Sequence, residues 1–172
     1  YVMRYTLPVT GCAAVHTVHN VADKEVDRIG RAIHRYAFRR GVVPVAVSHE
    51  VARSFAEVYG MPPAATIPNG IATERFYRPE AREEWRRANG FAPDDVLIVS
   101  VARLEPQKNP LALVTAFERL PEEFHLVLVG DGSLRPQLTG RDRVHLLGVR
   151  DDLPALLSAA DVFALASDWE GH

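Results

Sequence analysis

Short apolar runs alternate with amphipathic stretches along most of this sequence, and this alternation constrains the fold more than any other feature. Residues 96–102 and 124–129 are near-continuous apolar runs, as expected for strands that are covered on both faces. Between such runs, apolar residues recur every three to four positions, which is typical of helices. Strands that alternate with helices in this way predict a parallel sheet. We therefore expect an α/β protein.

The composition excludes several other classes of protein. The 172 residues are 47% hydrophobic and 24% charged, which is typical of a globular chain with a sizeable core and not of a disordered, collagen-like or coiled-coil chain. No stretch approaches the ~18 uncharged apolar residues of a membrane span. The net charge of −2 gives no sign of a nucleic-acid partner. The single Cys12 cannot form an internal disulfide, so a reducing, cytoplasmic location is expected.

The first part of the chain predicts one set of strands and helices, followed by a linker. We expect strands over residues 13–19, 42–47 and 64–67 and helices over residues 23–40 and 48–59. Residues 68–79 have no clear periodicity and begin and end with proline. We assign residues 1–70 to a first domain and residues 71–79 to a linker.

The second part of the chain predicts a further α/β segment. We expect strands over residues 96–102, 124–129, 144–147 and 162–166 and helices over residues 79–89, 111–120 and 151–160. Residues 80–172 therefore form part of a second domain. Since the chain begins without Met and stops just after an apolar run, we expect an internal fragment of a longer protein.

The loop after the strand at residues 96–102 carries the strongest chemical signal. Arg103 and Lys108 flank a proline-stiffened loop at the carboxyl end of a strand, where open α/β sheets bind ligands. Lys108 is one of only two lysines, and it directly precedes Asn109 and Pro110, which predict the start of a helix. Two cations beside a helix N-terminus form an anion site that suits a diphosphate. The alternative is a solvated surface loop.

Three other polar segments follow predicted strands, and each has a plainer explanation. Gly130 and Asp131 lie in a Gly-Asp-Gly turn that lets a ligand or a backbone approach closely, or that is simply a βα turn. Glu170 and Gly171 could bind sugar hydroxyls or belong to an ordinary loop. His19 ends the first strand and could be structural.

Missing motifs narrow the chemistry further. The sequence contains no G-x-G-x-x-G dinucleotide fingerprint and no G-x-S-x-G elbow, which disfavours dehydrogenases and hydrolases. It has no D-x-D pair and no Cys/His cluster, so we expect no metal site and no cofactor.

The helix expected at residues 23–40 carries a basic row on the face opposite its predicted apolar stripe. Arg28, Arg31, Arg35 and Arg39 follow each other at helical spacing. Such a row could contact an anionic membrane surface at the inner face of the cell membrane, or it could be a solvated helix face.

Taken together, these segments resemble the family-4 glycosyltransferases, retaining enzymes of the GT-B fold with two facing Rossmann-like domains. The resemblance follows the family's order over nearly the whole chain. The matching segments are Thr17-Val18-His19-Asn20, Pro68-Asn69-Gly70-Ile71 with Phe76 and Pro79, Val101-Ala102-Arg103-Leu104 with Lys108-Asn109, Leu128-Val129-Gly130-Asp131-Gly132, Leu147-Gly148-Val149 with Asp152-Leu153, and Ser167 with Glu170-Gly171.

The resemblance implies transfer of a sugar from a nucleotide diphosphate sugar to an acceptor glycan, lipid or small molecule, without a metal ion and with retention of configuration. It implies that Arg103 and Lys108 grip the diphosphate and that Glu170 contacts the donor sugar. His19 would face the sugar from the acceptor domain, and Arg150 would lie beside the base. Residues 1–70 would be the later part of the acceptor domain, and residues 80–172 the earlier part of the donor domain.

The sequence departs from the family in what it lacks. The second glutamate of the family's pair would lie beyond residue 172, and the glycine-rich acceptor loop would precede residue 1. We expect this chain to be inactive alone. A sugar-nucleotide epimerase of the same fold and a non-catalytic nucleotide-sugar-binding module remain as alternatives.

Overall fold

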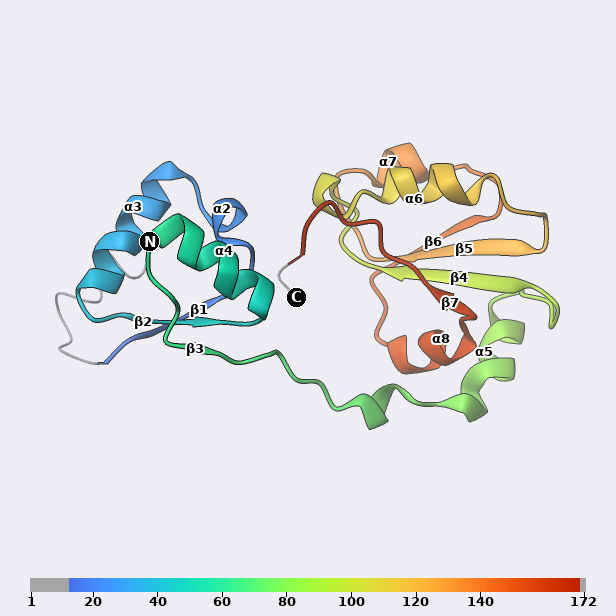
Figure 1. The fold of residues 1–172 in the computed structure, drawn as a ribbon. Coiled ribbons are helices and arrows are strands. Elements are labelled where there is room, and N and C mark those ends of the chain that lie inside the picture. The colour runs from blue at the N-terminus through green and yellow to red at the C-terminus, as the bar shows by residue number, and fades with distance from the viewer. Residues whose placement is uncertain (1–12, 171–172) are drawn as a thin grey trace. The chain divides into compact units, whose positions relative to one another are not determined.

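The structure, a computed structural model, describes residues 13–170. These residues form two compact units, one made of residues up to Gly70 together with Trp169 and Glu170, and one made of Ile71–Asp168. Both are α/β units with parallel sheets (Figure 1).

The sheet of the first unit has three parallel strands in the order β1-β2-β3. They are β1 (Val15–Val18), β2 (Val43–Ala46) and β3 (Ala65–Thr66), with Val15 opposite Val43 and Val45 opposite Ala65. Burial alternates along β1, as a period of two requires, so Val18 is buried whereas Val15 is exposed. The expected strands are confirmed, although β3 is shorter than predicted.

Three helices lie on one side of this sheet: α2 (Ala22–Glu25), α3 (Arg28–Arg39) and α4 (His49–Tyr59) (Figure 1). The predicted limits of α4 are confirmed, because Ser48 caps its first turn by accepting from Val51 N–H and Gly60 ends it in the left-handed conformation. The core packs α3 and α4 onto the strands through a cluster of aromatic rings. Its aromatic members are Phe38, Phe55 and Tyr59.

The single helix predicted over residues 23–40 is wrong in two respects. The chain breaks after Glu25, because Asp27 starts a new helix by accepting a hydrogen bond from Gly30 N–H at 2.7 Å. The predicted apolar stripe (Val26, Ile29, Ile33, Tyr36 and Ala37) is buried only in part, since Ala37 is buried but Ile29 and Tyr36 are 67% and 62% exposed. Ala37 and Phe38 form the buried face of α3.

The second unit has a four-stranded parallel sheet in the order β6-β5-β4-β7. The strands are β4 (Val96–Val101), β5 (Phe124–Val129), β6 (Val144–Gly148) and β7 (Val162–Phe163). The expected strands are again confirmed, with β7 shorter than predicted. Because β4 is covered on both faces, its successive residues pack into different parts of the core. Leu97 belongs to the cluster on one face of the sheet, and Ile98 to the cluster on the other.

Helices cover both faces of this sheet (Figure 1). The helices α6 (Pro110–Phe117) and α7 (Arg135–Leu138) lie on one face, and α5 (Arg82–Ala88) and α8 (Leu153–Ala159) on the other. The helix predicted over residues 79–89 begins as a short 3-10 turn, η2 (Pro79–Ala81), before α5. Another 3-10 turn, η1 (Thr73–Phe76), lies in the segment predicted as a linker. This doubly wound arrangement leaves the carboxyl ends of the strands open to a ligand.

Buried polar contacts fix α5 against the sheet. The Arg86 side chain is 2% exposed and donates to the carbonyls of Ala159 and Asp95 at 3.0 and 2.9 Å. Arg86 also pairs with the Asp161 carboxylate, which accepts in addition from Arg82 and from Leu97 N–H. Burial raises the pKa of Asp161, but these hydrogen bonds outweigh burial and leave it lowered overall.

Candidate functional site

A pocket of about 250 Å³ opens at the carboxyl ends of β4, β5 and β6. Four residues predicted to bind a donor, Arg103, Gly130, Asp131 and Arg150, line it together. The other lining residues are Val101, Ala102, Val129, Val149 and Leu153. Apolar walls with a few convergent charged groups are the usual composition of a ligand site. The two arginines come from loops nearly 50 residues apart, so the sheet topology brings them to one place.

The loop after β4 holds its two cations in different ways. Arg103 is exposed, and its guanidinium lies 3.4 Å from the Gln107 side-chain oxygen. Leu104 is 2% exposed and anchors the loop in the core beneath α6. Lys108 ends the 3-10 turn η3 (Pro106–Lys108) and directly precedes Asn109. Thus Arg103 lines the pocket, whereas Lys108 lies next to the N-terminus of α6.

Asn109 joins this loop to the segment that follows β7. It adopts the left-handed conformation, with φ of 46°, and caps α6 by accepting from Ala112 N–H at 3.4 Å. Its amide donates to the Asp168 carboxylate at 2.9 Å, and Asp168 N–H donates to the Gln107 carbonyl at 2.9 Å. The role of Asp168 was not predicted from the sequence. Its position after a predicted parallel strand, where ligand-site residues often lie, could have indicated it.

The glycines of the turn after β5 are required by packing between two loops. A Cβ on Gly130 would lie 2.0 Å from the Ala102 carbonyl oxygen, and one on Gly132 would lie 2.5 Å from that of Leu104. Gly130 also has φ of 132°, which residues with side chains rarely adopt. Of the two explanations that the sequence allowed, close approach of a backbone therefore accounts for both glycines.

Side chains of the same turn hold the loop after β4. The Glu105 carboxylate accepts from the Ser133 hydroxyl at 2.6 Å and from Ser133 N–H at 2.9 Å. These two hydrogen bonds lower the pKa of Glu105. The backbone adds a hydrogen bond from Leu104 N–H to the Asp131 carbonyl at 2.9 Å. The turn after β5 therefore holds the loop that carries Arg103 through these hydrogen bonds.

The Arg150 side chain is occupied by a bidentate ion pair. Its guanidinium donates to both oxygens of Asp152, at 2.7 and 2.5 Å, and this raises the pKa of Arg150. Asp152 also accepts from the Trp85 indole at 2.9 Å, and chiefly through the Arg150 hydrogen bonds its pKa falls to about 2. The Arg150 guanidinium is therefore engaged by Asp152, and contact of its backbone with a ligand stays a prediction of the family resemblance.

The remaining predicted site residues lie outside this pocket's lining. His19 is exposed and directly follows β1 in the first unit. Glu170 is partly buried and groups with the first unit, and Gly171 lies outside the described residues. Asp131 is the single carboxylate in the described lining, which does not make a metal site there.

The described helices include none that is long and apolar enough to cross a membrane.

Two family models match the chain, one in each half. Residues 81–172 match Glycosyl transferases group 1, and residues 1–75 match Glycosyltransferase Family 4. A relative from Escherichia coli, the UDP-Gal:alpha-D-GlcNAc-diphosphoundecaprenol alpha-1,3-galactosyltransferase, is 30% identical over 91% of this chain and 46% of its own length. A D-inositol 3-phosphate glycosyltransferase from Xylanimonas cellulosilytica is 34% identical over 62% of this chain and 28% of its own length.

The fold is similar to that of solved glycosyltransferases. Anabaena HepE, crystallised in complex with UDP and glucose, superposes with a TM-score of 0.79 at 22% identity, over 89% of this chain and 46% of the HepE chain. The expected GT-B fold class is thereby confirmed. The chain spans about half the length of the E. coli relative and of HepE.

Proposed function

The chain belongs to the Glycosyl transferases group 1 family, and from this premise we propose that the protein transfers a sugar from a nucleotide diphosphate sugar to an acceptor hydroxyl, with retention of configuration. One observation carries the proposal: Arg103, Gly130, Asp131 and Arg150 line one pocket at the carboxyl ends of parallel strands. The UDP and glucose held by HepE, a protein of the same fold, are consistent with a donor of this class.

Charge stabilisation is the main chemical task in this reaction. When the nucleotide diphosphate departs, negative charge develops on its β-phosphate while the sugar becomes oxocarbenium-like. Arg103 from the pocket and Lys108 beside the N-terminus of α6 would stabilise that charge, as a metal ion does in other enzymes. Both are carried by a loop that Asp168 and Glu105 hold in place, so little reorganisation is needed as the charge forms.

The other proposed roles complete the site. Glu170 and Gly171 would bind hydroxyls of the donor sugar, and His19 would face that sugar from the acceptor domain. The backbone of Arg150 would contact the base. We favour attack on the face from which the diphosphate leaves, assisted by the leaving phosphate.

Kinetics of the full-length protein test the diphosphate grip. We expect Arg103→Ala and Lys108→Ala each to lower kcat/KM for the donor by about 10²–10³-fold, the usual cost of removing one group that stabilises transition-state charge. Arg119→Ala is the control, because Arg119 is an exposed arginine of the same unit outside the pocket lining. An unchanged kcat/KM in both loop variants would refute the grip.

The same assay separates the alternatives by their products. A transferase releases nucleotide diphosphate only when an acceptor is supplied. An epimerase would convert the donor without an acceptor, and a binding module would leave it intact.

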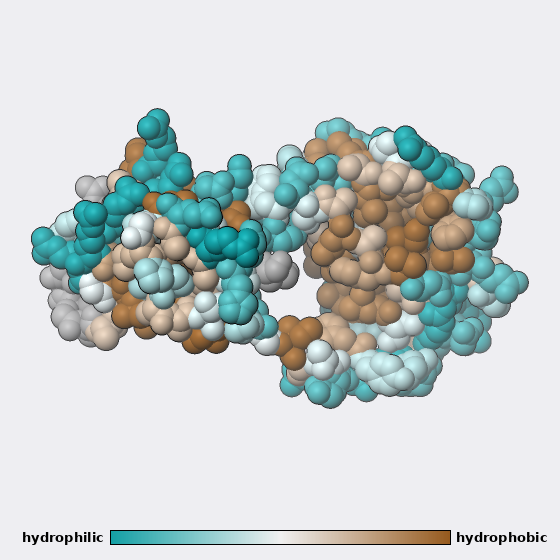
Figure 2. Space-filling model, viewed as in Figure 1, coloured by the Kyte–Doolittle hydropathy of each residue, from teal (hydrophilic) through white to brown (hydrophobic). Residues whose placement is uncertain are grey.

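We further propose that α3 docks on an anionic membrane, which would give the enzyme access to a lipid-linked acceptor. The lipid-linked substrate in the name of the E. coli relative makes such an acceptor plausible. Arg28 and Arg39 are exposed on α3 together with Ile29 and Tyr36, and Figure 2 shows strongly hydrophilic residues over this helix. Cations interspersed with exposed apolar side chains suit the surface of an anionic bilayer.

Vesicle co-sedimentation tests this docking. Since a basic residue near an anionic surface contributes ~1 kcal/mol, Arg28→Ser with Arg39→Ser should weaken binding to phosphatidylglycerol vesicles at least tenfold. Arg35 is left intact because its guanidinium donates to the Val58 carbonyl at 2.8 Å. Arg87→Ser with Arg119→Ser removes the same charge from the second unit and should have no effect. Equal binding to phosphatidylcholine vesicles would contradict the proposal.

A further inference from the structure

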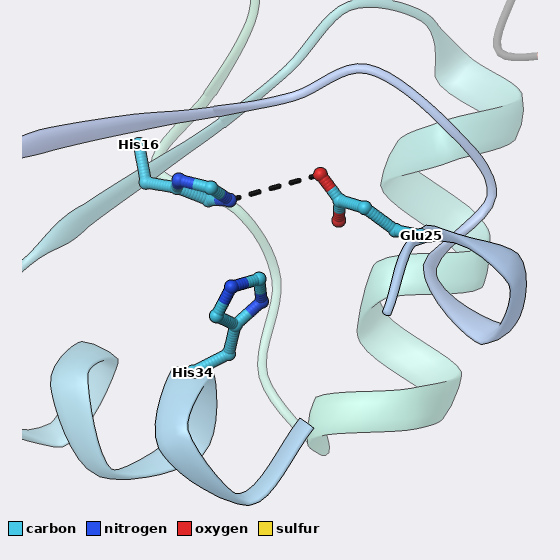
Figure 3. A group of neighbouring side chains, drawn as sticks. All are labelled: His16, Glu25 and His34. Carbon is cyan, nitrogen blue, oxygen red and sulfur yellow. Dashed lines mark ion pairs between the residues drawn. The ribbon is translucent and has the colours of Figure 1, made fainter. Parts of the chain in front are cut away.

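Three metal-ligating side chains meet inside the first unit. They are His16 on β1, Glu25 at the end of α2 and His34 on α3 (Figure 3). One potential ligand atom from each lies within 4.8 Å of the others. The His16 Nε2 atom is 3.7 Å from Glu25 Oε1, and the two imidazole rings are 4.8 Å apart, nearly edge to face.

The local fold explains why these three residues converge. The period of two along β1 turns His16 to the same side of the sheet as the buried Val18. The chain breaks between α2 and α3 where Asp27 caps α3, and Figure 3 shows the Glu25 and His34 side chains, from these two helices, pointing into the same space as His16. The residues are nine positions apart on three elements, a spacing that matches no short metal-binding motif.

Two atoms of the cluster lack the partners that buried polar groups need. His16 Nε2 and Glu25 Oε2 are buried and have no hydrogen-bond partner among the described residues. The side chains of His16 and Glu25 are only 21% and 15% exposed. A buried carboxylate oxygen without a partner is costly, and a bound ion would supply the missing partner.

The third residue is oriented by a neighbour. His34 Nδ1 lies 3.1 Å from the Tyr59 hydroxyl, which leaves Nε2 for a ligand. Outer hydrogen bonds of this kind fix the ring orientation of metal-binding histidines. Burial lowers the pKa of His34 and the neighbouring His16 lowers it further, which favours the neutral imidazole that a metal ligand needs. Burial raises the pKa of Tyr59 to about 12, so its hydroxyl keeps its proton.

We propose that His16, Glu25 and His34 bind a zinc ion that ties β1, α2 and α3 together. Two imidazole nitrogens and one carboxylate are a donor set that suits Zn²⁺, with water as the fourth ligand. Bonds of ~2.0–2.2 Å to a tetrahedral ion place ligand atoms about 3.4 Å apart. The 3.7 Å between His16 Nε2 and Glu25 Oε1 is already close to that value, and the ligand atom of His34, which lies within 4.8 Å of the other two, would move closer on binding.

Zinc titration of the chelator-stripped, tag-free full-length protein tests the site. We expect one Zn²⁺ per chain by calorimetry, and a visible absorption spectrum of four-coordinate Co²⁺ when cobalt replaces zinc. His16→Gln, Glu25→Gln and His34→Gln should each weaken zinc binding more than tenfold. Tyr59→Phe should weaken it about tenfold through loss of the outer hydrogen bond. His49→Gln is the matched control, because it removes an exposed imidazole from the same unit.

Circular dichroism checks that each variant folds. Glu25→Gln is the safest variant in this respect, because glutamine has the same shape as glutamate. If a histidine variant does not fold, the Co²⁺ spectrum of the unmodified protein and the Glu25→Gln titration decide the matter. Zinc bound equally by Glu25→Gln and the unmodified protein, or no stoichiometric binding at all, would overturn the proposal.

Discussion

At the scale of single residues, the glycines after β5 show how backbone packing determines a site. Gly130 allows the turn after β5 to touch the Ala102 carbonyl, and through this contact the loop carrying Arg103 is held at the pocket. The sequence alone predicted a glycine turn here but could not tell a ligand from a backbone as the close neighbour. That distinction depends on the register of β4 and β5, which no local pattern encodes.

Substitution of Gly130 tests this packing. Gly130→Ala should lower the free energy of unfolding by about 3 kcal/mol, because the new methyl group would overlap the Ala102 carbonyl and the positive φ adds strain. Gly140→Ala is the control: its φ is 77°, but its Cβ would meet nothing within 4 Å, so only about 1 kcal/mol of conformational strain is expected. Urea denaturation measures both, and equal losses would refute the steric explanation.

Acid titration tests the Arg150–Asp152 pair. Because the folded state lowers the pKa of Asp152 from 3.8 to about 2, its contribution to stability is complete above 3.8 and disappears as the pH falls through 2. After allowance for solvent screening we expect about 1 kcal/mol. The difference in unfolding free energy between the unmodified protein and Asp152→Asn should shrink over this range. A difference that stays constant down to pH 2 would show that the pair is not ionised as described.

At the scale of elements, apolar runs were enough to predict the strands, whereas the helices depended on contacts that the sequence does not display. Strands β4 and β5 are buried on both faces, and their continuous apolar residues identify them. The long helix over residues 23–40 was wrong because the cap at Asp27 and the crossing of α3 with α4 decide which face is buried. The single turn of α7 was missed, since four residues have too little periodicity to be recognised.

At the scale of the whole molecule, the order of motifs along the chain indicated, better than any motif alone, which loops would lie together. Arg103, Gly130, Asp131 and Arg150 come from three loops, and the parallel sheet places those loops at one edge. The bracing roles of Glu105 and Asp168 and the contact of Asp152 with Trp85 were missed, because each of these contacts joins residues distant in sequence. Prediction of such partners requires the strand order, which the sequence does not specify directly.

The central claim is that the pocket at the ends of β4, β5 and β6 binds a nucleotide diphosphate sugar, and hydrogen exchange of the full-length protein with and without UDP tests it most directly. We predict slower exchange in peptides covering residues 101–109, 129–133 and 148–153, and loss of that protection when Arg103→Ala and Lys108→Ala are combined. Protection confined to other segments, or undiminished in the double variant, would contradict the claim.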